Sequence, residues 1–190
     1  YGRIDILVNN AGALWWQPML KTPEKRYDLV MDVNSKATFF ACQMVLPSMI
    51  ENKWGHIVNM SPPIDITLLK GHIAYFMSKY GMTMVTHGLA EEVKQHNIAV
   101  NSLWPETMIE SYATLNWGLG NSSMWRKAEI LADSTLAIIK KEPPSLTGKA
   151  LIDVDFLRSE GVEDFDQYNC VPGSNPPSLN KLWEIMAGRS

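Results

Sequence analysis

The sequence predicts an α/β protein built on a parallel β-sheet, and three observations support this fold class. Short apolar runs of strand length alternate with longer stretches of helical character. Each of the longer stretches is long enough to connect two parallel strands by a crossover. The composition, with 46% hydrophobic and 19% charged residues, is typical of a folded domain rather than a disordered chain.

Four segments are predicted as strands. Residues 4–9 (IDILVN), 55–60 (GHIVNM) and 98–104 (IAVNSLW) are short apolar runs of the kind found in buried strands. Pro105 closes the third of these runs, because proline cannot continue a central strand. A last strand is expected within residues 145–155 (SLTGKALIDVD).

Three longer stretches are predicted as helices. Residues 23–52 start with a proline after Thr22, which suits an N-cap followed by a first helical turn. This helix is expected in one or two pieces, because Pro47 should bend or locally break it. Residues 73–94 and the amphipathic stretch 125–141 are the other two helices.

One domain, over residues 1–155, is expected to hold all of these elements. Within it, residues 106–123 are rich in Gly, Ser and Asn and are predicted as a loop with room for a short helix. Residues 156–190 contain three prolines and are predicted as an irregular tail. The chain does not begin with Met and enters its first apolar strand almost at once, so we interpret it as a fragment.

Charge and composition exclude several classes of protein. A net charge of −3, with no basic patch, gives no electrostatic reason to expect nucleic acid or an anionic membrane as partner. No apolar run reaches the roughly 18 residues of a membrane span, and no signal peptide is visible. Cys42 and Cys170 match no metal-ligand spacing, and we interpret them as free thiols in a reducing intracellular compartment, with a single disulfide as the alternative. The four histidines form no ligand pattern, so no metal is expected.

The predicted topology gathers polar residues at one rim of the sheet. In parallel α/β sheets, reactive groups collect beyond the carboxyl ends of the strands. That rule brings together residues 9–12, Ser61 and residues 104–107. Tyr75 and Lys79, near the start of the helix 73–94, are expected to face the same rim.

Tyr75 and Lys79 have the spacing of a proton-transfer pair. Residues four apart in a helix project from nearly the same face, so both side chains can reach one substrate-sized volume. A phenol titrates near 10, and an ammonium beside it favours the phenolate. Lowering the tyrosine pKa by ~2–3 units would need roughly 3–4 kcal/mol of differential stabilisation. The spacing alone is weak evidence, since a surface pair without function would look the same.

Further motifs surround this pair in a fixed order. They are DILVNNAG (5–12), DVN (32–34), HIVNMS (56–61), AYFMSKYGM (74–82), IAVNSLWP (98–105) and LTGKALIDVD (146–155). In order and spacing they resemble the short-chain dehydrogenase/reductase (SDR) family from its fourth strand onward. The resemblance implies a Rossmann-like, doubly wound parallel sheet whose first three strands are absent from this chain. It also implies a nicotinamide-dependent oxidoreductase that interconverts a secondary alcohol and a carbonyl.

The resemblance assigns catalytic roles to four residues. Tyr75 matches the family's catalytic acid/base, and Lys79 matches the lysine that lowers its pKa. Asn34 matches the helix asparagine that joins the proton relay through water. The family's carbonyl-binding hydroxyl lies about thirteen residues before the tyrosine, where this chain has Pro62. Ser61 is the nearest hydroxyl and is the candidate for that role, with a turn-capping serine as the alternative.

The resemblance also implies half of a cofactor site. Asn9, Ala11 and Gly12 match the family's Asn-Asn-Ala-Gly turn, and the catalytic tyrosine and lysine hold the nicotinamide ribose. Pro105 and Thr107 are expected near the nicotinamide and a phosphate. The cofactor is expected to be NADP or NAD, because the segments that choose between them are not in this chain.

Departures from the usual family pattern point to one branch of it. Glu106 stands where many members have Gly, and Val154-Asp155 stand where the last strand would end in Gly-Gly. This branch implies a preference for NADP and a small, lipid-like alcohol or ketone as substrate. It also implies a homo-oligomer formed through the two long helices. A eukaryotic member would be cytoplasmic, peroxisomal or mitochondrial.

Three hypotheses follow from the sequence. The first is an active oxidoreductase that uses the tyrosine–lysine pair. The second is a non-catalytic family relative that serves as a binding or scaffold module, in which the displaced Ser61 reflects lost catalysis. The third is that the fragment alone folds poorly and is inactive, because its first strand exposes an apolar edge.

Overall fold

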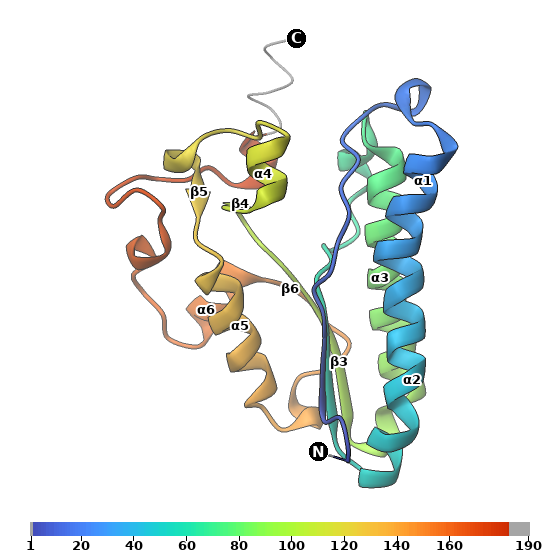
Figure 1. Cartoon of the computed structure of the whole chain (residues 1–190). Coiled ribbons are helices and arrows are strands. Elements are labelled where there is room, and N and C mark those ends of the chain that lie inside the picture. The colour runs from blue at the N-terminus through green and yellow to red at the C-terminus, as the bar shows by residue number, and fades with distance from the viewer. Residues whose placement is uncertain (1, 183–190) are drawn as a thin grey trace. The chain divides into compact units, whose positions relative to one another are not determined.

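The structure is a computed structural model that describes residues 2–182. Its contacts divide the chain into two compact units. The first unit contains the residues up to Trp104 together with Ile138–Leu151, and the second contains Pro105–Ala137 together with the residues from Ile152 onward. Figure 1 shows the elements of both units.

The first unit is built on a parallel sheet. Its strand order is β1 (Ile6–Asn9), β2 (Gly55–Asn59), β3 (Ile98–Trp104) and β6 (Ala150–Ile152). The pairs β1–β2 and β2–β3 are parallel. The register sets Asn9 beside Asn59 and Asn59 beside Ser102, so three polar residues form a row at or near the carboxyl ends of these strands. The α/β fold with a parallel sheet is therefore confirmed.

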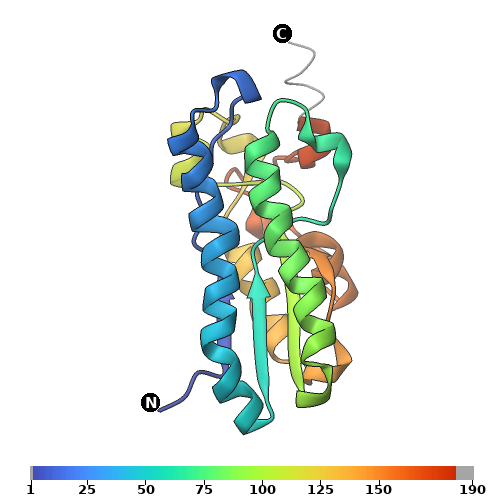
Figure 2. The same ribbon diagram turned by 90° about the vertical axis from the view of Figure 1, so that its right-hand side faces the viewer.

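Two long helices cover one face of this sheet (Figure 2). The first is a continuous helical segment made of α1 (Glu24–Val30), a π-helical turn (Met31–Lys36) and α2 (Ala37–Asn52). The second is α3 (Ile73–Glu92). Pro47 does not interrupt α2, contrary to the local break that the sequence allowed.

The core of the first unit lies between these helices and the strands. Its buried residues are Cys42, Val45 and Met49 of α2, Leu89 and Ala90 of α3, Val93, and Ile57, Ile98 and Val100 of the strands. Gly55 opens β2 directly under Met49, and a β-carbon there would lie only 2.6 Å from the Met49 sulfur. The strand therefore starts with the one residue that lets α2 approach it this closely.

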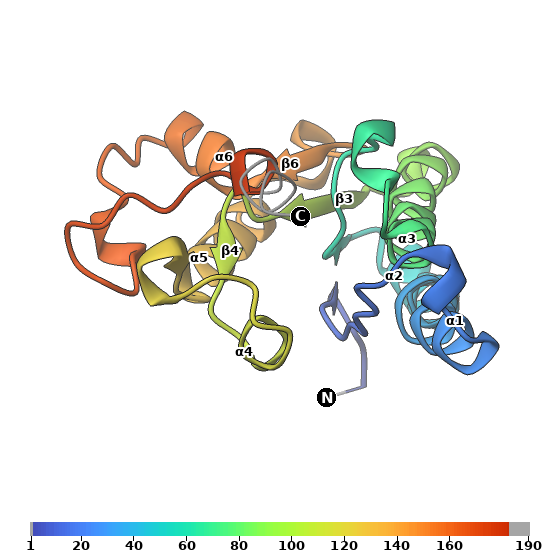
Figure 3. The same cartoon turned by 90° about the horizontal axis from the view of Figure 1, so that it is seen from above.

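Elements of the second unit are labelled in Figure 3, and the unit has its own small core. Its elements are β4 (Met108–Ile109), α4 (Tyr112–Asn116), β5 (Trp125–Arg126), α5 (Glu129–Ile139, whose last residues belong to the first unit) and α6 (Asp153–Ser159). Strands β4 and β5 pair in parallel. Ile130 of α5 packs with Val154 and Leu157 of α6 and with Tyr168.

Several boundaries differ from the prediction. The last strand ends at Ile152, and the expected continuation over Asp153–Asp155 is wrong because these residues begin α6. The Asp153 carboxylate accepts the backbone N–H of Val154, which favours a helical start over a strand. The tail predicted from residue 156 thus begins inside a helix, and its residues 183–190 lie outside the described part.

Residues 106–123, predicted as a loop with room for a short helix, contain α4, which starts with a capping box between Ser111 and Thr114. The first strand was expected to be buried, but it forms one edge of the sheet order, and Ile6 and Val8 are each 39% exposed.

Cys42 and Cys170 are free thiols, as predicted. Within residues 2–182, no helix combines the length and hydropathy that a bilayer span requires.

Gly81 provides a test of how α3 packs on the π-helical turn. A β-carbon at Gly81 would overlap Ser35 Oγ and lie 3.0 Å from Ser35 Cβ, whereas one at Gly88 of the same helix would meet no atom within 4 Å. Gly81→Ala should therefore lower the free energy of unfolding by about 1–3 kcal/mol. Gly88→Ala should raise it by about 0.5–1 kcal/mol, because alanine favours the helix. Urea unfolding of both variants measures this difference, and equal stability would contradict the packing described here.

Candidate active site

Helix α3 places Tyr75 and Lys79 on its buried face. The two side chains are one turn apart, and only 9% of Tyr75 and 5% of Lys79 are exposed. Residues four apart in a helix project from nearly the same face. The structure therefore brings together the two residues that the sequence proposed as a proton-transfer pair.

The Lys79 ammonium lies between the loops that follow β1 and β2. Its Nζ donates a hydrogen bond of 2.8 Å to the backbone oxygen of Met60 and lies 5.5 Å from the ring centroid of Trp104. A β-carbon on Gly12 would be 3.5 Å from Nζ. Within residues 2–182, no carboxylate forms a salt bridge with this lysine, and burial lowers its pKa to about 8.

Asn34 connects the loop after β1 to α3. It is fully buried in the π-helical turn, a form of helix that is frequent at functional sites. Its Oδ1 accepts the N–H of Ala13 at 2.8 Å, and its Nδ2 donates to the oxygen of Ala13 at 3.0 Å and to Ser78 Oγ at 2.8 Å. Ser78 Oγ donates in turn to the backbone oxygen of Tyr75 at 2.6 Å.

These contacts limit how the Asn34 side chain could bind the relay water expected from the sequence. Both amide hydrogens are used inside the protein, so the side chain can bind a relay water only through a second lone pair on Oδ1. Ser78 was not predicted, although a serine between Tyr75 and Lys79 on the buried face of a helix was visible in the sequence. Because Ser78 bonds both Asn34 and the backbone of Tyr75, it fixes the asparagine relative to the tyrosine.

Apolar and aromatic groups enclose Tyr75. Its ring meets Trp16 edge-on at a centroid distance of 5.5 Å and Phe76 at 5.4 Å. Leu14, Leu68, Leu69 and Trp104 pack against the same cluster. Burial raises the pKa of Tyr75, so the expectation that Lys79 lowers it is wrong for this structure, in which desolvation of the phenol dominates. The tyrosine is a neutral acid at neutral pH.

Ser61 lies at the carboxyl end of β2, but its hydroxyl faces the protein interior. The residue is fully buried, and its Oγ accepts a hydrogen bond of 2.9 Å from Thr83 Oγ1 on α3. The same threonine hydroxyl lies 2.7 Å from the backbone oxygen of Pro62. These contacts anchor the loop after β2 to the helix that carries Tyr75.

Asn9 is also engaged inside the fold. Its Nδ2 donates to Asn59 Oδ1 at 2.8 Å and to Cys42 Sγ at 3.5 Å. Asn59 then donates to Thr86 Oγ1 at 2.8 Å, which completes a chain from β1 through β2 to α3. The contacts described for Asn9 therefore support the strand ends, whereas its neighbours Ala11 and Gly12 are exposed. Asn59 and Thr86 were not predicted.

Pro105 and Thr107 belong to the second unit, so the residues proposed for cofactor binding are divided between the two units. Thr107 forms an isolated antiparallel bridge with Ser178. Only 1% of Thr107 is exposed, and its Oγ1 is buried without a hydrogen-bond partner in the part of the chain that the structure describes. Among residues 2–182, no three His, Cys, Asp or Glu side chains gather closely enough to hold a metal ion.

Comparison with known proteins identifies the class. The family model described as short chain dehydrogenase matches residues 1–114, and the chain belongs to this family. It is 45% identical over 176 residues to hydroxysteroid dehydrogenase-like protein 2 of Homo sapiens, and 44% identical to the protein of that name from Bos taurus. Each alignment covers 91% of this chain and 42% of the relative, so the chain spans less than half the length of these relatives.

Solved structures agree with this assignment. The structure of a putative dehydrogenase from Xanthomonas campestris is 35% identical, with a TM-score of 0.88 over 94% of this chain and 66% of that one. Two structures at 27% identity contain a cofactor. One is a 4-hydroxyisoleucine dehydrogenase complexed with NADH (TM-score 0.64, 78% of this chain and 66% of that one), and the other is a metagenomic short-chain oxidoreductase in complex with NADP (TM-score 0.65, 80% and 62%). The predicted family is confirmed.

The pH dependence of stability tests the buried state of Lys79. Its folded pKa of about 8 lies below the unfolded value near 10.4, so between these values the unfolded chain binds more protons. The contribution of Lys79 to the free energy of unfolding should therefore rise by about 2 kcal/mol from pH 8 to pH 10.

The measurement is the difference in the free energy of unfolding between the wild type and Lys79→Met, obtained from urea unfolding at each pH. A difference is needed because burial also raises the pKa values of Tyr75 and Cys42, which makes stability fall as their unfolded forms ionise. Lys94→Met is the control, because that ammonium is 69% exposed. A difference that does not change with pH would show that Lys79 is solvated.

Proposed function

We propose that the protein is an NAD(P)-dependent oxidoreductase that interconverts a secondary alcohol and a carbonyl compound. Membership of the short-chain dehydrogenase family supports the reaction class. The observation that carries the proposal is a buried ammonium, Lys79, one turn after the buried phenol of Tyr75 and bonded to the backbone at the end of β2. Strongly perturbed buried groups of this kind are typical of active sites.

The residues present fit a nicotinamide cofactor. An ammonium has three N–H donors. The Met60 oxygen accepts one of them at 2.8 Å and Met82 Sδ accepts a second at 3.8 Å, which leaves one donor for a ribose hydroxyl. Gly12, which has no side chain, lies beside that ammonium, and Thr107 Oγ1 in the second unit lacks a partner in the described residues. In the first unit, Lys79, Tyr75 and the backbone at Ala11–Gly12 would hold the ribose side. In the second unit, taken by itself, Pro105 and Thr107 are the residues proposed for the nicotinamide and a phosphate. The cofactor supplies or accepts the hydride when it is bound.

Tyr75 carries the proton of the reaction. Because burial raises its pKa, the phenol holds its proton at neutral pH and can donate it to the oxygen of a carbonyl substrate. Lys79, with a pKa of about 8, is mostly cationic at pH 7 and stabilises the phenolate that remains. In the oxidative direction the phenolate takes the proton of the alcohol. Lys79 therefore stabilises the phenolate form of Tyr75, even though burial is the dominant effect on the pKa of Tyr75 in the protein without cofactor.

Asn34 and Ser61 have supporting parts in this proposal. The hydrogen bonds of Asn34 to Ala13 and Ser78 hold the loop after β1 against α3, and a free lone pair on Oδ1 would bind a relay water. Ser61 would orient the substrate carbonyl only after its hydroxyl turns away from Thr83.

The substrate is proposed to be an apolar small molecule, such as a lipid-like alcohol or ketone. Tyr75 belongs to an apolar cluster with Phe76 and Tyr80, against which Leu14, Trp16, Leu68, Leu69 and Trp104 pack. A wall of this composition favours an apolar skeleton and leaves the phenol as the polar group that orients it.

A non-catalytic binding role is the second candidate. Two observations favour this second candidate. The Ser61 hydroxyl faces Thr83 and is therefore not placed to bind a substrate carbonyl, and Tyr75 is buried. An absorbance assay of NADPH oxidation by the full-length protein with a panel of apolar ketones separates the two. Turnover of any of them would remove the second candidate.

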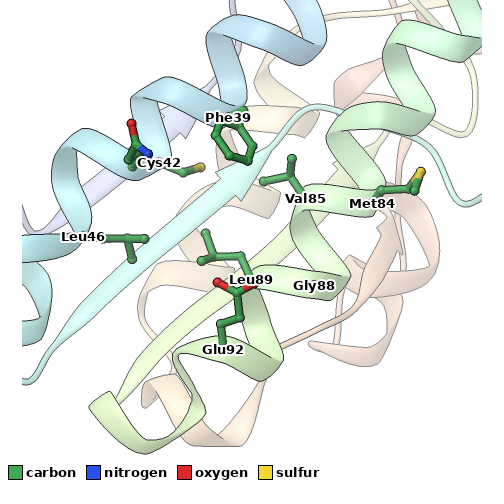
Figure 4. Close-up of a pocket in the computed structure, with 9 residues that line it drawn as sticks. Phe39, Cys42, Leu46, Met84, Val85, Gly88, Leu89 and Glu92 are labelled. Carbon is green, nitrogen blue, oxygen red and sulfur yellow. The ribbon is translucent and has the colours of Figure 1, made fainter.

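We also propose that α2 and α3 form a homo-oligomer interface. A groove of about 340 Å³ runs between the two helices on their outer side (Figure 4). It is lined by Phe39, Cys42, Gln43, Leu46, Met84, Val85, Gly88, Leu89 and Glu92. Phe39 is 51% exposed and Met84 is 66% exposed, and a second copy of this face would remove both from water.

Tyr75→Phe in the full-length protein tests the catalytic assignment. Loss of the phenol removes the proton donor, so kcat should fall at least about 100-fold, while the dissociation constant for NADPH stays within about three-fold. Tyr112→Phe is the matched control, because that ring is 87% exposed in the second unit, and its kcat should not change. Steady-state kinetics and cofactor fluorescence provide the two readouts. Unchanged turnover in Tyr75→Phe would show that the assignment is wrong.

Gly88→Arg tests the interface. A side chain at Gly88 meets no atom within 4 Å in the monomer, so the arginine variant should fold normally but place a long, charged side chain in the groove where the second copy would pack. The oligomer should therefore dissociate, as measured by light scattering coupled to gel filtration. Leu20→Glu is the control, because Leu20 is fully exposed and lies outside the groove. An unchanged mass for Gly88→Arg, or loss of the oligomer in both variants, would contradict the proposed face.

A further inference from the structure

Asp153 is a buried carboxylate that holds the backbone of a distant segment. It is the first residue of α6 and is fully buried. Its Oδ1 accepts the N–H of Glu106 at 2.8 Å and the N–H of Val154 at 2.7 Å. The first of these bonds joins α6 to the residue between Pro105 and Thr107, and all of these residues belong to the second unit.

The cost of burying this carboxylate indicates that it has a role beyond packing. Its Oδ2 is buried with no hydrogen-bond partner in the described residues, and burial raises its pKa to about 6. An ionised carboxylate in such a place destabilises the folded state, and an apolar side chain would avoid that cost. What the carboxylate provides is a charge-assisted acceptor for the Glu106 N–H.

The segment held by Asp153 is anchored on other sides as well. The Glu106 carboxylate lies 3.5 Å from a terminal nitrogen of Arg126 on β5, and the Glu106 backbone oxygen accepts the N–H of Leu179 at 2.7 Å. Arg126 and Glu106 are also the charged groups that act on Asp153, with opposite effects on its pKa. Glu106 is thus fixed through its N–H, its oxygen and its side chain.

We propose that Asp153 is a positioning residue for the cofactor. Its bond to the Glu106 N–H sets the backbone of Pro105–Thr107 and thereby fixes the Thr107 hydroxyl, which is buried and without a partner in the described residues, as a hydrogen-bonding group for the cofactor. This inference rests on the proposed function, which assigns Pro105 and Thr107 to the cofactor. It gives a role to Glu106, one of the residues in which this chain departs from many members of its family.

Two substitutions at Asp153 and one control test the proposal in the full-length protein. Asp153→Ala removes the acceptor and should weaken NADPH binding about ten-fold at pH 7.5. Asp153→Asn keeps an oxygen for both N–H groups but has no charge, so binding should weaken only about three-fold at pH 7.5. Near pH 5.0 the wild-type carboxylate is largely protonated, so the wild type and Asp153→Asn should bind NADPH equally. Asp155→Asn is the control, because that carboxylate is 73% exposed on the same helix.

A second readout separates this role from simple support of the fold. Because the ionised carboxylate destabilises the folded state, Asp153→Asn should raise the unfolding temperature at pH 7.5 while weakening cofactor binding. A residue that only supports the fold would lower the unfolding temperature when replaced. Amide hydrogen exchange at Glu106 and Thr107 should accelerate in Asp153→Ala, and this measurement needs no cofactor.

Each outcome bears on the proposal. If Asp153→Ala folds and binds NADPH as tightly as the wild type does, the proposal is overturned. If Asp153→Ala fails to fold, Asp153→Asn is the deciding variant. NADPH binding by Asp153→Asn that equals wild-type binding at both pH values would overturn the proposal. If the wild type binds neither NADPH nor NADH, the proposed function fails, and unchanged exchange at Glu106 would show separately that Asp153 does not position this segment.

Discussion

The first unit depends on one constraint, the burial of the Lys79 ammonium where the loops after β1 and β2 meet α3. A buried charge without a carboxylate is costly, and the pKa of about 8 corresponds to roughly 3 kcal/mol of destabilisation at neutral pH. Two contacts offset part of this cost: the ammonium donates a hydrogen bond to the Met60 oxygen, and it lies over the ring of Trp104. Stability alone gives no reason for such a residue, whereas the proposed reaction, which creates a phenolate at Tyr75, does.

Polar contacts around this charge hold three separate segments in register. Asn34 fixes the loop after β1, and through Ser78 it is tied to the backbone of Tyr75. The chain from Asn9 through Asn59 to α3 joins the strand ends to the same helix. Since these side chains bond one another, they order the site in the absence of a ligand. Pre-organisation of this kind reduces the rearrangement needed when substrate binds.

Much of this arrangement was predictable from the sequence because it depends on local periodicity and motif order. The parallel strands follow from apolar runs, and the shared face of Tyr75 and Lys79 follows from their spacing on one helix. The helix that starts at Asp153 was missed, because the apolar run before it suggested that the strand continued. The contact between Asp153 and Glu106 was also not predictable, because it joins residues 47 positions apart in the sequence. The raised pKa of Tyr75 was missed for a similar reason, since desolvation depends on side chains contributed by several loops.

The most direct test of this account is the protonation state of Lys79 in the folded protein. In the full-length protein without cofactor, lysines labelled with ¹³C at Cε can be titrated by NMR, with Lys79→Met identifying the resonance. We predict that the resonance lost in Lys79→Met titrates near pH 8 in the wild type. If this resonance instead titrates at about 10.4, the value of a lysine in a model peptide, the ammonium is solvated, and the proposed active site does not exist in solution.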